Sequence, residues 1–266
     1  VFADAWTEYI IIFGSGIGIF AAANGMSVIK RTIAQIMHLL KPSPFTKQEF
    51  LNLMAILYQI FSAARKDGLL SLESHVESPD KSTIFAKYPA FLLNHHAVEF
   101  LCDNIKVIMS GGVPAMDLND MMEMDLEAAA LENHAVPDAV SNAGDAMPAL
   151  GIVACVLGVV ITMGKIGGDP REIGESVGVA LVGTFLGISV SYLAVTPLAR
   201  ALSQSHIPEE AYLNCIRLAL HSFARGDAPM TCVEFARRNI PPELRANLAE
   251  TEKFCKAGRQ PAPASR

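Results

Sequence analysis

Three long uncharged runs stand out in the pattern of hydrophobic and polar positions along the chain. They cover residues 9–29, 146–164 and 177–199, and charged residues lie close to both ends of each run. An α-helix rises about 1.5 Å per residue, so each run can cross the roughly 30 Å hydrocarbon core of a bilayer. The pattern therefore predicts three transmembrane helices, the last two forming a hairpin around the short segment 165–176. Two buried core helices of a soluble protein are the alternative for that pair.

Small residues recur in these runs at spacings that place them on one face of a helix. In lipid, small residues four positions apart let helix backbones approach closely. We therefore predict a helix-packing role for six glycines, namely Gly14, Gly18, Gly151, Gly158, Gly183 and Gly187. Residues 16–21 also match the GxGxxA dinucleotide-binding pattern. The acidic residue that should follow about 20 positions later is missing, so packing is the favoured interpretation.

Runs 146–164 and 177–199 contain no Asp, Glu, Lys, Arg or His. A charge at mid-membrane costs about 2.5–3.5 kcal/mol on insertion scales, and a charge that is tolerated there usually marks an ion pathway. If the protein conducts protons or other cations, the sequence predicts that the carboxylate they need comes from another chain.

The remaining sequence is typical of polar helices, in segments 30–145 and 200–256. Lys30 and Arg31 directly follow the first run, and basic residues beside a span favour the cytoplasmic side. Both polar segments are therefore predicted to be cytoplasmic, with segment 165–176 periplasmic. Residues 1–29 would then hold a periplasmic start and the first visible span, and we expect a further span upstream of Val1. The final residues, 257–266, are predicted to be disordered.

Composition narrows the class of protein. Of the 266 residues, 51% are hydrophobic and 18% are charged, as in a membrane protein with a large polar portion. The net charge of −6 argues against nucleic-acid binding. The five cysteines form no CxxC pair, which favours free thiols, and no catalytic sequence pattern is present. We therefore predict neither an enzyme nor a metal or cofactor site.

Four short segments together resemble one known family. They are PALGIVA at 148–154, VGTFLGI at 182–188, TPLA at 196–199 and VEFAR at 233–237. As a set they resemble the flagellar motor stator A-subunit family (MotA/PomA), over nearly the whole chain. The resemblance implies an all-α polytopic protein of the bacterial inner membrane with a helical cytoplasmic domain. The family has four transmembrane helices, of which three would be visible here.

The resemblance also implies partners. Family members form a ring, a pentamer in the known architecture, around the membrane helices of two MotB-type B subunits, and an aspartate of the B helix binds the coupling ion. Ion flow is expected to turn the ring, whose cytoplasmic domain then pushes on the rotor protein FliG. By position, Arg65 and Glu73 match the rotor-contacting charges of the family. An ordinary exposed charge pair is the alternative.

Five residues match the ion pathway that the resemblance implies. Pro148 and Pro197 match channel prolines, which remove a backbone donor and can bend a helix. Thr184 matches a pore-facing hydroxyl, although a threonine that bonds its own helix is an equal alternative. Tyr192 is a candidate for the cytoplasmic mouth. Sodium should prefer several oxygen ligands, and Cys155 with a single threonine stands where sodium-driven members have threonines, so we predict a proton as the ion.

Two other functions remain open at this point. The ExbB/TolQ branch shares the ring-around-helix mechanism, energises outer-membrane processes and normally has three spans. The segments 65–73 and 233–237 argue against it. A membrane scaffold that conducts nothing is the second alternative, and the absence of charge from the last two runs is compatible with it.

Overall fold

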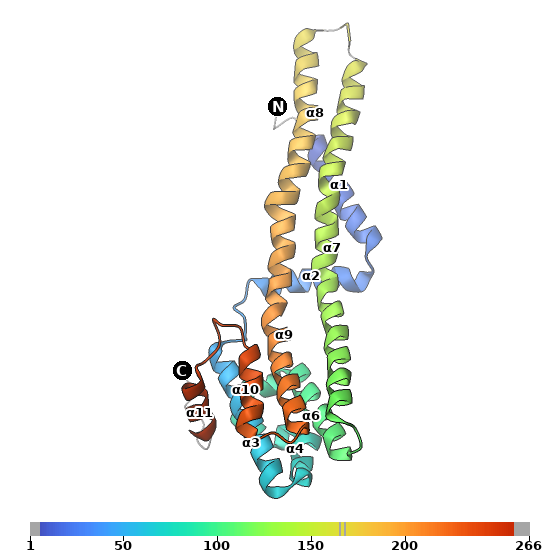
Figure 1. The fold of residues 1–266 in the computed structure, drawn as a ribbon. Coiled ribbons are helices and arrows are strands. Elements are labelled where there is room, and N and C mark those ends of the chain that lie inside the picture. The colour runs from blue at the N-terminus through green and yellow to red at the C-terminus, as the bar shows by residue number, and fades with distance from the viewer. Residues whose placement is uncertain (1–5, 165, 168, 258–266) are drawn as a thin grey trace. The chain divides into compact units, whose positions relative to one another are not determined.

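A computed structural model describes residues 6–164, 166–167 and 169–257, and every regular element in this part of the chain is a helix (Figure 1). The predicted all-α fold is confirmed. Contacts divide the chain into two compact units. Unit 1 comprises Val1–Pro42 and Leu131–His206, and unit 2 comprises Ser43–Ala130 and Ile207–Arg266.

The bounds of the helices follow the chain order. Unit 1 contains α1 (Trp6–Ala23), α2 (Met26–Leu39), most of α7 (Ala115–Met163), α8 (Pro170–Val190), a π-helical turn (Ser191–Val195) and the start of α9 (Thr196–Ala224). Unit 2 contains the rest of α7 and α9 together with α3 (Lys47–Asp67), α4 (Glu73–Glu77), α5 (Pro89–Leu93), α6 (His95–Ser110), α10 (Pro229–Asn239) and α11 (Leu248–Ala257). Short 3-10 turns cover Leu69–Leu72, Pro79–Lys81 and Phe85–Lys87.

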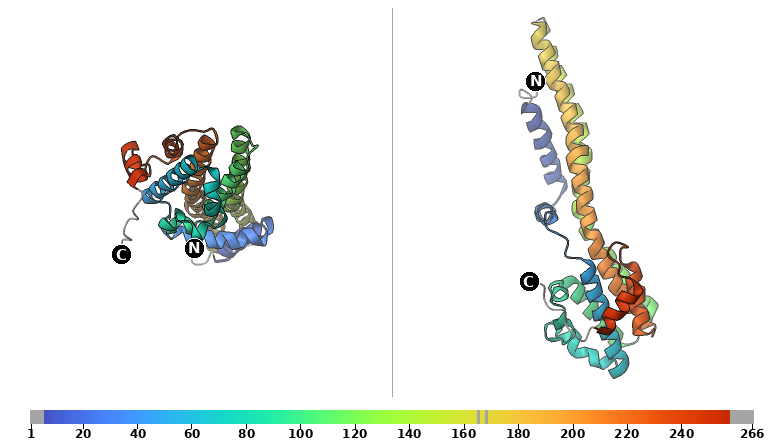
Figure 2. Two further views of the ribbon diagram at one scale, coloured as in Figure 1. Left: turned by 90° about the horizontal axis from the view of Figure 1, so that it is seen from below. Right: turned by 90° about the vertical axis from the view of Figure 1, so that its left-hand side faces the viewer.

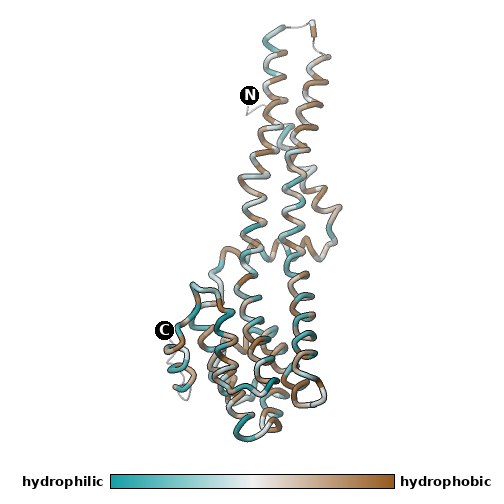
Figure 3. Tube along the Cα trace, in the orientation of Figure 1, coloured by the Kyte–Doolittle hydropathy of each residue, from teal (hydrophilic) through white to brown (hydrophobic). Residues whose placement is uncertain are grey.

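Two of the predicted spans lie in helices that are long and apolar enough to cross a membrane. The first is α7, and the second is the continuous helical stretch from Pro170 to Ala224. Figure 3 shows hydrophobic residues dominating parts of α7 and α8. The predicted domain boundaries at residues 145 and 199 fall inside α7 and α9, which continue through them without interruption.

The segment that joins α7 to α8 is shorter than residues 165–176, because α8 begins at Pro170. Asp169 caps this helix, its side chain accepting a hydrogen bond of 2.9 Å from the backbone N–H of Arg171. Proline at the first helical position needs no hydrogen-bond acceptor, which favours a helix start here. The tail predicted to be disordered covers 257–266. Its first residue, Ala257, is instead the last residue of α11, and the rest of the tail lies outside the described residues.

The first uncharged run is not one helix, and the prediction of a single span over 9–29 is wrong at its C-terminal end. The run breaks between α1 and α2, where the amide of Asn24 donates to the carbonyl of Phe20 at 2.8 Å. The backbone of Gly25 is extended there, with φ −66° and ψ 159°. The side-chain bond of Asn24 competes with the helix, and glycine disfavours its continuation.

Helix α2 packs against the later helices of unit 1. Val28 and Ile36 contact a small buried cluster formed by four side chains, Val136, Val140, Ala199 and Leu202. An ion pair between Arg31 and Glu132 joins α2 to α7 at a half-exposed position. The burial of one face of α2 therefore explains why this part of the run turns away from the direction of α1.

Helix α3 lies at the centre of the core of unit 2. Its buried side chains recur at helical spacing and include Phe50, Leu53, Leu57, Phe61 and Ala64. The hydroxyl of Thr46 accepts a 3.3 Å hydrogen bond from the N–H of Glu49 and caps the start of the helix. Gly68, with φ +84°, ends it. Figure 1 shows α10 and α11 beside α3, and both helices contact it.

The cysteines of unit 2 are buried free thiols. Burial raises the pKa of Cys102 to about 11 and the pKa values of Cys215 and Cys255 to about 12. A thiol with so high a pKa stays neutral near pH 7 and is a poor nucleophile and metal ligand. These cysteines therefore act as small core residues.

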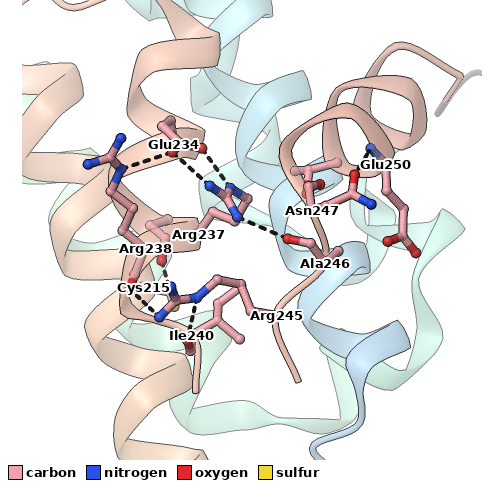
Figure 4. Close-up of polar contacts among 11 residues, drawn as sticks. Cys215, Glu234, Arg237, Arg238, Ile240, Arg245, Ala246, Asn247 and Glu250 are labelled. Carbon is pink, nitrogen blue, oxygen red and sulfur yellow. Dashed lines mark hydrogen bonds and ion pairs between the residues drawn. The ribbon is translucent and has the colours of Figure 1, made fainter. Parts of the chain in front are cut away.

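A cluster of charged side chains joins α10 to the segment before α11 (Figure 4). Glu234 accepts hydrogen bonds from Arg237, at 2.6 and 2.8 Å, and from Arg238, at 2.9 Å. Arg237 also donates to the carbonyl of Ala246 at 3.0 Å, and Arg245 donates to the carbonyl of Ile240 at 2.8 Å. Glu234 and Arg237 belong to the VEFAR segment, so its two charges form an internal ion pair.

We predict that Glu234→Gln destabilises the protein by about 1–3 kcal/mol at neutral pH, because two arginines lose a charged acceptor. The hydrogen bonds from Arg237 hold the pKa of Glu234 below its ordinary value. The folded state thus binds fewer protons than the unfolded one, and stability from this carboxylate is present above the unfolded-state pKa of about 4.3 and lost as the pH falls through the folded-state pKa. The gap in melting temperature between wild type and variant should therefore shrink from pH 7 to pH 3.

Thermal unfolding of the full chain in detergent, followed by circular dichroism, measures this gap. Glu252→Gln is the matched control, because Glu252 pairs with Lys256 at 3.3 Å on an exposed helix surface. Its effect should stay within about 0.5 kcal/mol. Equal effects of the two substitutions would contradict the structural role of Glu234.

Candidate ion-conducting site

The spans of α7 and α8 meet through their glycines. A Cβ atom added to Gly187 would lie 2.6 Å from the carbonyl oxygen of Met147 and 2.9 Å from the Cα of Gly151. A Cβ added to Gly151 would lie 2.8 Å from the carbonyl oxygen of Gly183. Backbone atoms cannot move aside as the end of a side chain can, so both positions require glycine. Gly158 extends the contact, since its added Cβ would lie 2.6 Å from the Cβ of Ala180.

The glycines of α1 are placed differently. Cβ atoms added to Gly14 and Gly18 would meet nothing within 4 Å among the described residues, whereas one added to Gly16 would lie 2.4 Å from the side chain of Met147. The face that carries Gly14 and Gly18 is exposed in the single chain. Their predicted packing role therefore concerns contacts with another chain and stays a prediction.

Thr184 lies where α8 approaches α7. Its hydroxyl is 3.4 Å from the carbonyl oxygen of Gly151, to which it donates, so it bonds to the neighbouring helix. The side chain is half-buried, as is Cys155 on α7. Cys155 directly follows Ala154, whose Cβ lies against Gly183. The two candidate ion-pathway residues thus stand next to the contact of Ala154 with Gly183.

The two candidate prolines interrupt the hydrogen bonding of their helices. Pro148 lies inside the continuous helix α7, so the carbonyl of Gly144 loses its helical donor. Pro197 is the second residue of α9 and lies one residue after the π-helical turn, at whose end the N–H of Thr196 donates to the carbonyl of Ser191. Pro148 is half-buried, whereas Pro197 and the candidate mouth residue Tyr192 are exposed.

Glu8 is a residue that the sequence reasoning missed. It marked the polar end of run 9–29, yet its side chain packs against Gly183, well inside run 177–199 (Figure 2 shows α1 beside α8). Only 6% of its surface is exposed. The chain thus places a carboxylate of its own beside the uncharged runs, in addition to the one expected from another chain. The available signal was its position at the start of an apolar run that contains the small residues needed for close packing.

Unit 2 holds the two predicted rotor-contacting charges on its surface. Arg65 lies in the last turn of α3, and Glu73 begins α4 after the 3-10 turn Leu69–Leu72. Both side chains are exposed, while Leu72 between them is fully buried. Leu72 therefore anchors the turn, and the positive φ of Gly68 allows the chain to reverse there.

Comparison with known families assigns most of the chain. Residues 2–68 match the family described as Motility protein A N-terminal, and residues 94–213 match the MotA/TolQ/ExbB proton channel family. The chain is 34% identical to Motility protein A of Salmonella typhimurium over 254 residues, which are 96% of this chain and 86% of that protein.

The fold is similar to that of two solved structures. One is the structure of C. jejuni MotAB, with a TM-score of 0.69 and 18% identity, which covers 89% of this chain and 84% of that chain. The other is the flagellar MotAB stator complex from Bacillus subtilis, with a TM-score of 0.63 and 22% identity, which covers 93% of this chain and 86% of that chain.

The paired apolar helices and the family match define a polytopic membrane subunit of the proton channel class. More narrowly, the chain belongs to the motility protein A family. It is an ion-conducting stator subunit of the bacterial flagellar motor. The match of residues 2–68 decides against the ExbB/TolQ branch, and the channel family decides against a scaffold that conducts nothing. The family is one of channels, not of enzymes.

We predict that Gly151→Ala and Gly187→Ala each destabilise the α7–α8 pair by about 1–3 kcal/mol, because the added methyl group meets backbone atoms of the opposite helix. Gly14→Ala and Gly18→Ala are matched controls, since no atom in the described part of the chain lies within 4 Å of their added Cβ atoms. Heat inactivation of the detergent-solubilised chain, read as the fraction still monodisperse, should separate the two pairs of variants. Equal melting of all four would contradict the packing described.

Proposed function

We propose that the chain forms a proton-driven stator together with a MotB-type subunit whose membrane helix carries the ion-binding aspartate. The observation that carries this proposal is the pair of uncharged spans in backbone contact, within a chain of the proton channel family. These two spans would form one closely packed side of an ion pathway, with the hydroxyl of Thr184 where α8 contacts α7. The names of the MotAB structures give the partner class for those proteins, and the shared fold supports extending it to this chain.

The ligands that the candidate pathway residues offer suit a proton better than a sodium ion. Sodium needs several oxygen ligands to replace its water shell, by analogy with other hard cations. The candidate pathway offers the thiol of Cys155 and a single threonine hydroxyl, already shared with the carbonyl of Gly151. Pro148 and Pro197 would free backbone carbonyls along the same helices, and Tyr192 would border the cytoplasmic mouth. The protein then needs no cofactor besides the translocated ion.

We further propose that five copies of the chain surround the B-subunit helices in the inner membrane. The α7 span supports an assembly in lipid, because six of its apolar side chains are more than half exposed: Ile152, Val153, Val156, Val160, Ile161 and Met163. Such side chains are suited to lipid or to a neighbouring copy. The free, buried thiols of unit 2 support a cytoplasmic location for that unit, because reducing compartments preserve thiols.

Torque would reach the rotor protein FliG through Arg65 and Glu73. Their exposure beside a turn anchored by Leu72 supports this role, since each charge is accessible and its backbone is held. Exposed charges act over about 10 Å at 0.1 M salt, so the contact would be sensitive to ionic strength.

We predict that Arg65→Glu lowers motor torque several-fold while membrane assembly with the B subunit stays intact. The defect should change with intracellular ionic strength, because salt screens exposed charges. Rotation of beads tethered to flagellar stubs measures torque, and co-purification with the B subunit measures assembly. Lys66→Glu is the matched control, one position along the same exposed helix end. Unchanged torque in Arg65→Glu would refute the rotor contact.

The choice of ion is tested by swimming. Cells that lack stators and express this chain with its B subunit should swim equally well in sodium-free and sodium-containing media, because the pathway lacks a sodium ligand set. The control is the same strain treated with a proton uncoupler, which should stop it in both media. Motility that requires sodium would keep the stator function and refute the proton.

A further inference from the structure

Glu8 is a buried carboxylate that the proposed mechanism does not use. It lies in the first turn of α1 with 6% of its surface exposed, and its Oε2 atom has no hydrogen-bond partner in the described part of the chain. Buried carboxylates in folded proteins are nearly always hydrogen-bonded or paired with a charge. An orphaned one therefore calls for a functional explanation.

The space that Glu8 occupies exists because two residues opposite it are small. A Cβ atom added to Gly183 on α8 would lie 2.9 Å from Oε2 of Glu8 and 3.2 Å from the Cβ of Ala154 on α7. Oε2 thus lies against the bare backbone of Gly183. Gly183 lies six residues after the start of run 177–199, which is about 9 Å along the helix. The sequence predicts that this start of the run is its periplasmic end.

Within the described residues, the uncharged runs of α7 and α8 bring no charged side chain to Glu8. Run 177–199 of α8 and α9 has only Tyr192 as a titratable residue, and run 146–164 of α7 has only Cys155. On α1 itself the adjacent Tyr9 is the other titratable side chain of the described residues. The nearest charge along α8 is Glu175, about 12 Å from Gly183, and it pairs with Arg171 at 3.5 Å on the surface. Glu172 lies further still along the helix.

Ionisable groups retained within membrane spans typically serve ion pathways or proton relays. The neighbours of Glu8 belong to the candidate pathway. Thr184 follows Gly183 on α8, and Cys155 follows Ala154 on α7.

We propose that Glu8 is a second proton-binding carboxylate of the channel, placed between the periplasmic side and the ion-binding acid of the partner helix. Its carboxylate accepts one proton from water on the periplasmic side and becomes the neutral acid. It then releases that proton through water to the partner's carboxylate and returns to its starting form, with no electron transferred. This inference rests on the proposed proton conduction. Gly183 is the positioning residue, because any side chain there would displace Oε2.

The test compares variants of the full chain co-purified with its B subunit and reconstituted into liposomes. Glu8→Gln keeps the shape of the side chain but cannot release a proton, so proton flux driven by a potassium diffusion potential should fall about tenfold or more, as for a lost proton-transfer group. Glu8→Asp should recover part of the flux. Glu175→Gln, which alters an exposed carboxylate of α8 outside the pathway, should leave the flux unchanged.

Infrared difference spectra of the same complexes between pH 5 and pH 8 give a readout that is independent of flux. The wild type should show a carboxylic-acid C=O band that titrates and is lost in Glu8→Gln but kept in Glu175→Gln. A Glu8→Gln complex with wild-type flux, or with an unchanged band, would overturn the inference. A wild-type complex that assembles without conducting protons would contradict the proposed function, and the band would still decide whether Glu8 binds a proton.

Discussion

The backbone contact between α7 and α8 is the constraint on which unit 1 depends. In lipid, apolar side chains gain little from meeting one another, so helices associate through close packing and shared polar contacts. Gly151 and Gly187 supply that packing, since a Cβ on either would overlap backbone atoms of the opposite helix. The contact fixes the register of the pair. It thereby sets the level of Thr184 against the carbonyl of Gly151 and the level of Gly183 against Ala154.

The sequence predicts this hairpin because its signals are local. Uncharged length and the spacing of small residues can be counted along one segment, and both α7 and α8 contain the predicted spans. The end of the first run depends on distant residues. The residues on both sides of Asn24 and Gly25 are similarly apolar, so the sequence does not show the break. The break follows from the packing of Val28 and Ile36 against a buried cluster more than 90 positions further along the chain. In the same way, only the fold distinguishes Gly16, which faces Met147, from Gly14 and Gly18.

The site was predictable to a similar extent. Resemblance to a family points to Thr184, the prolines and the exposed charges of unit 2, because these lie in recognisable segments. The burial of Glu8 was not predicted, because a charged residue beside an apolar run normally marks the end of a span. The depth of such a residue depends on how far α1 lies along α8, which is a tertiary contact. The role of the VEFAR segment was hidden for the same reason, since Arg237 bonds a carbonyl nine residues further along the chain.

The interrupted hydrogen bonds of the two helices coincide in space. Pro148 removes the helical donor of the Gly144 carbonyl, and a Cβ added to Gly144 would lie 2.9 Å from the side chain of Val195. Val195 ends the π-helical turn that precedes Pro197. Backbone freed from helical bonding is tolerated in a membrane where it is buried in protein or lines water. The helix pair is therefore packed closely around Gly151 and Gly187, and the two places where its helical hydrogen bonding is interrupted meet at the contact between Gly144 and Val195.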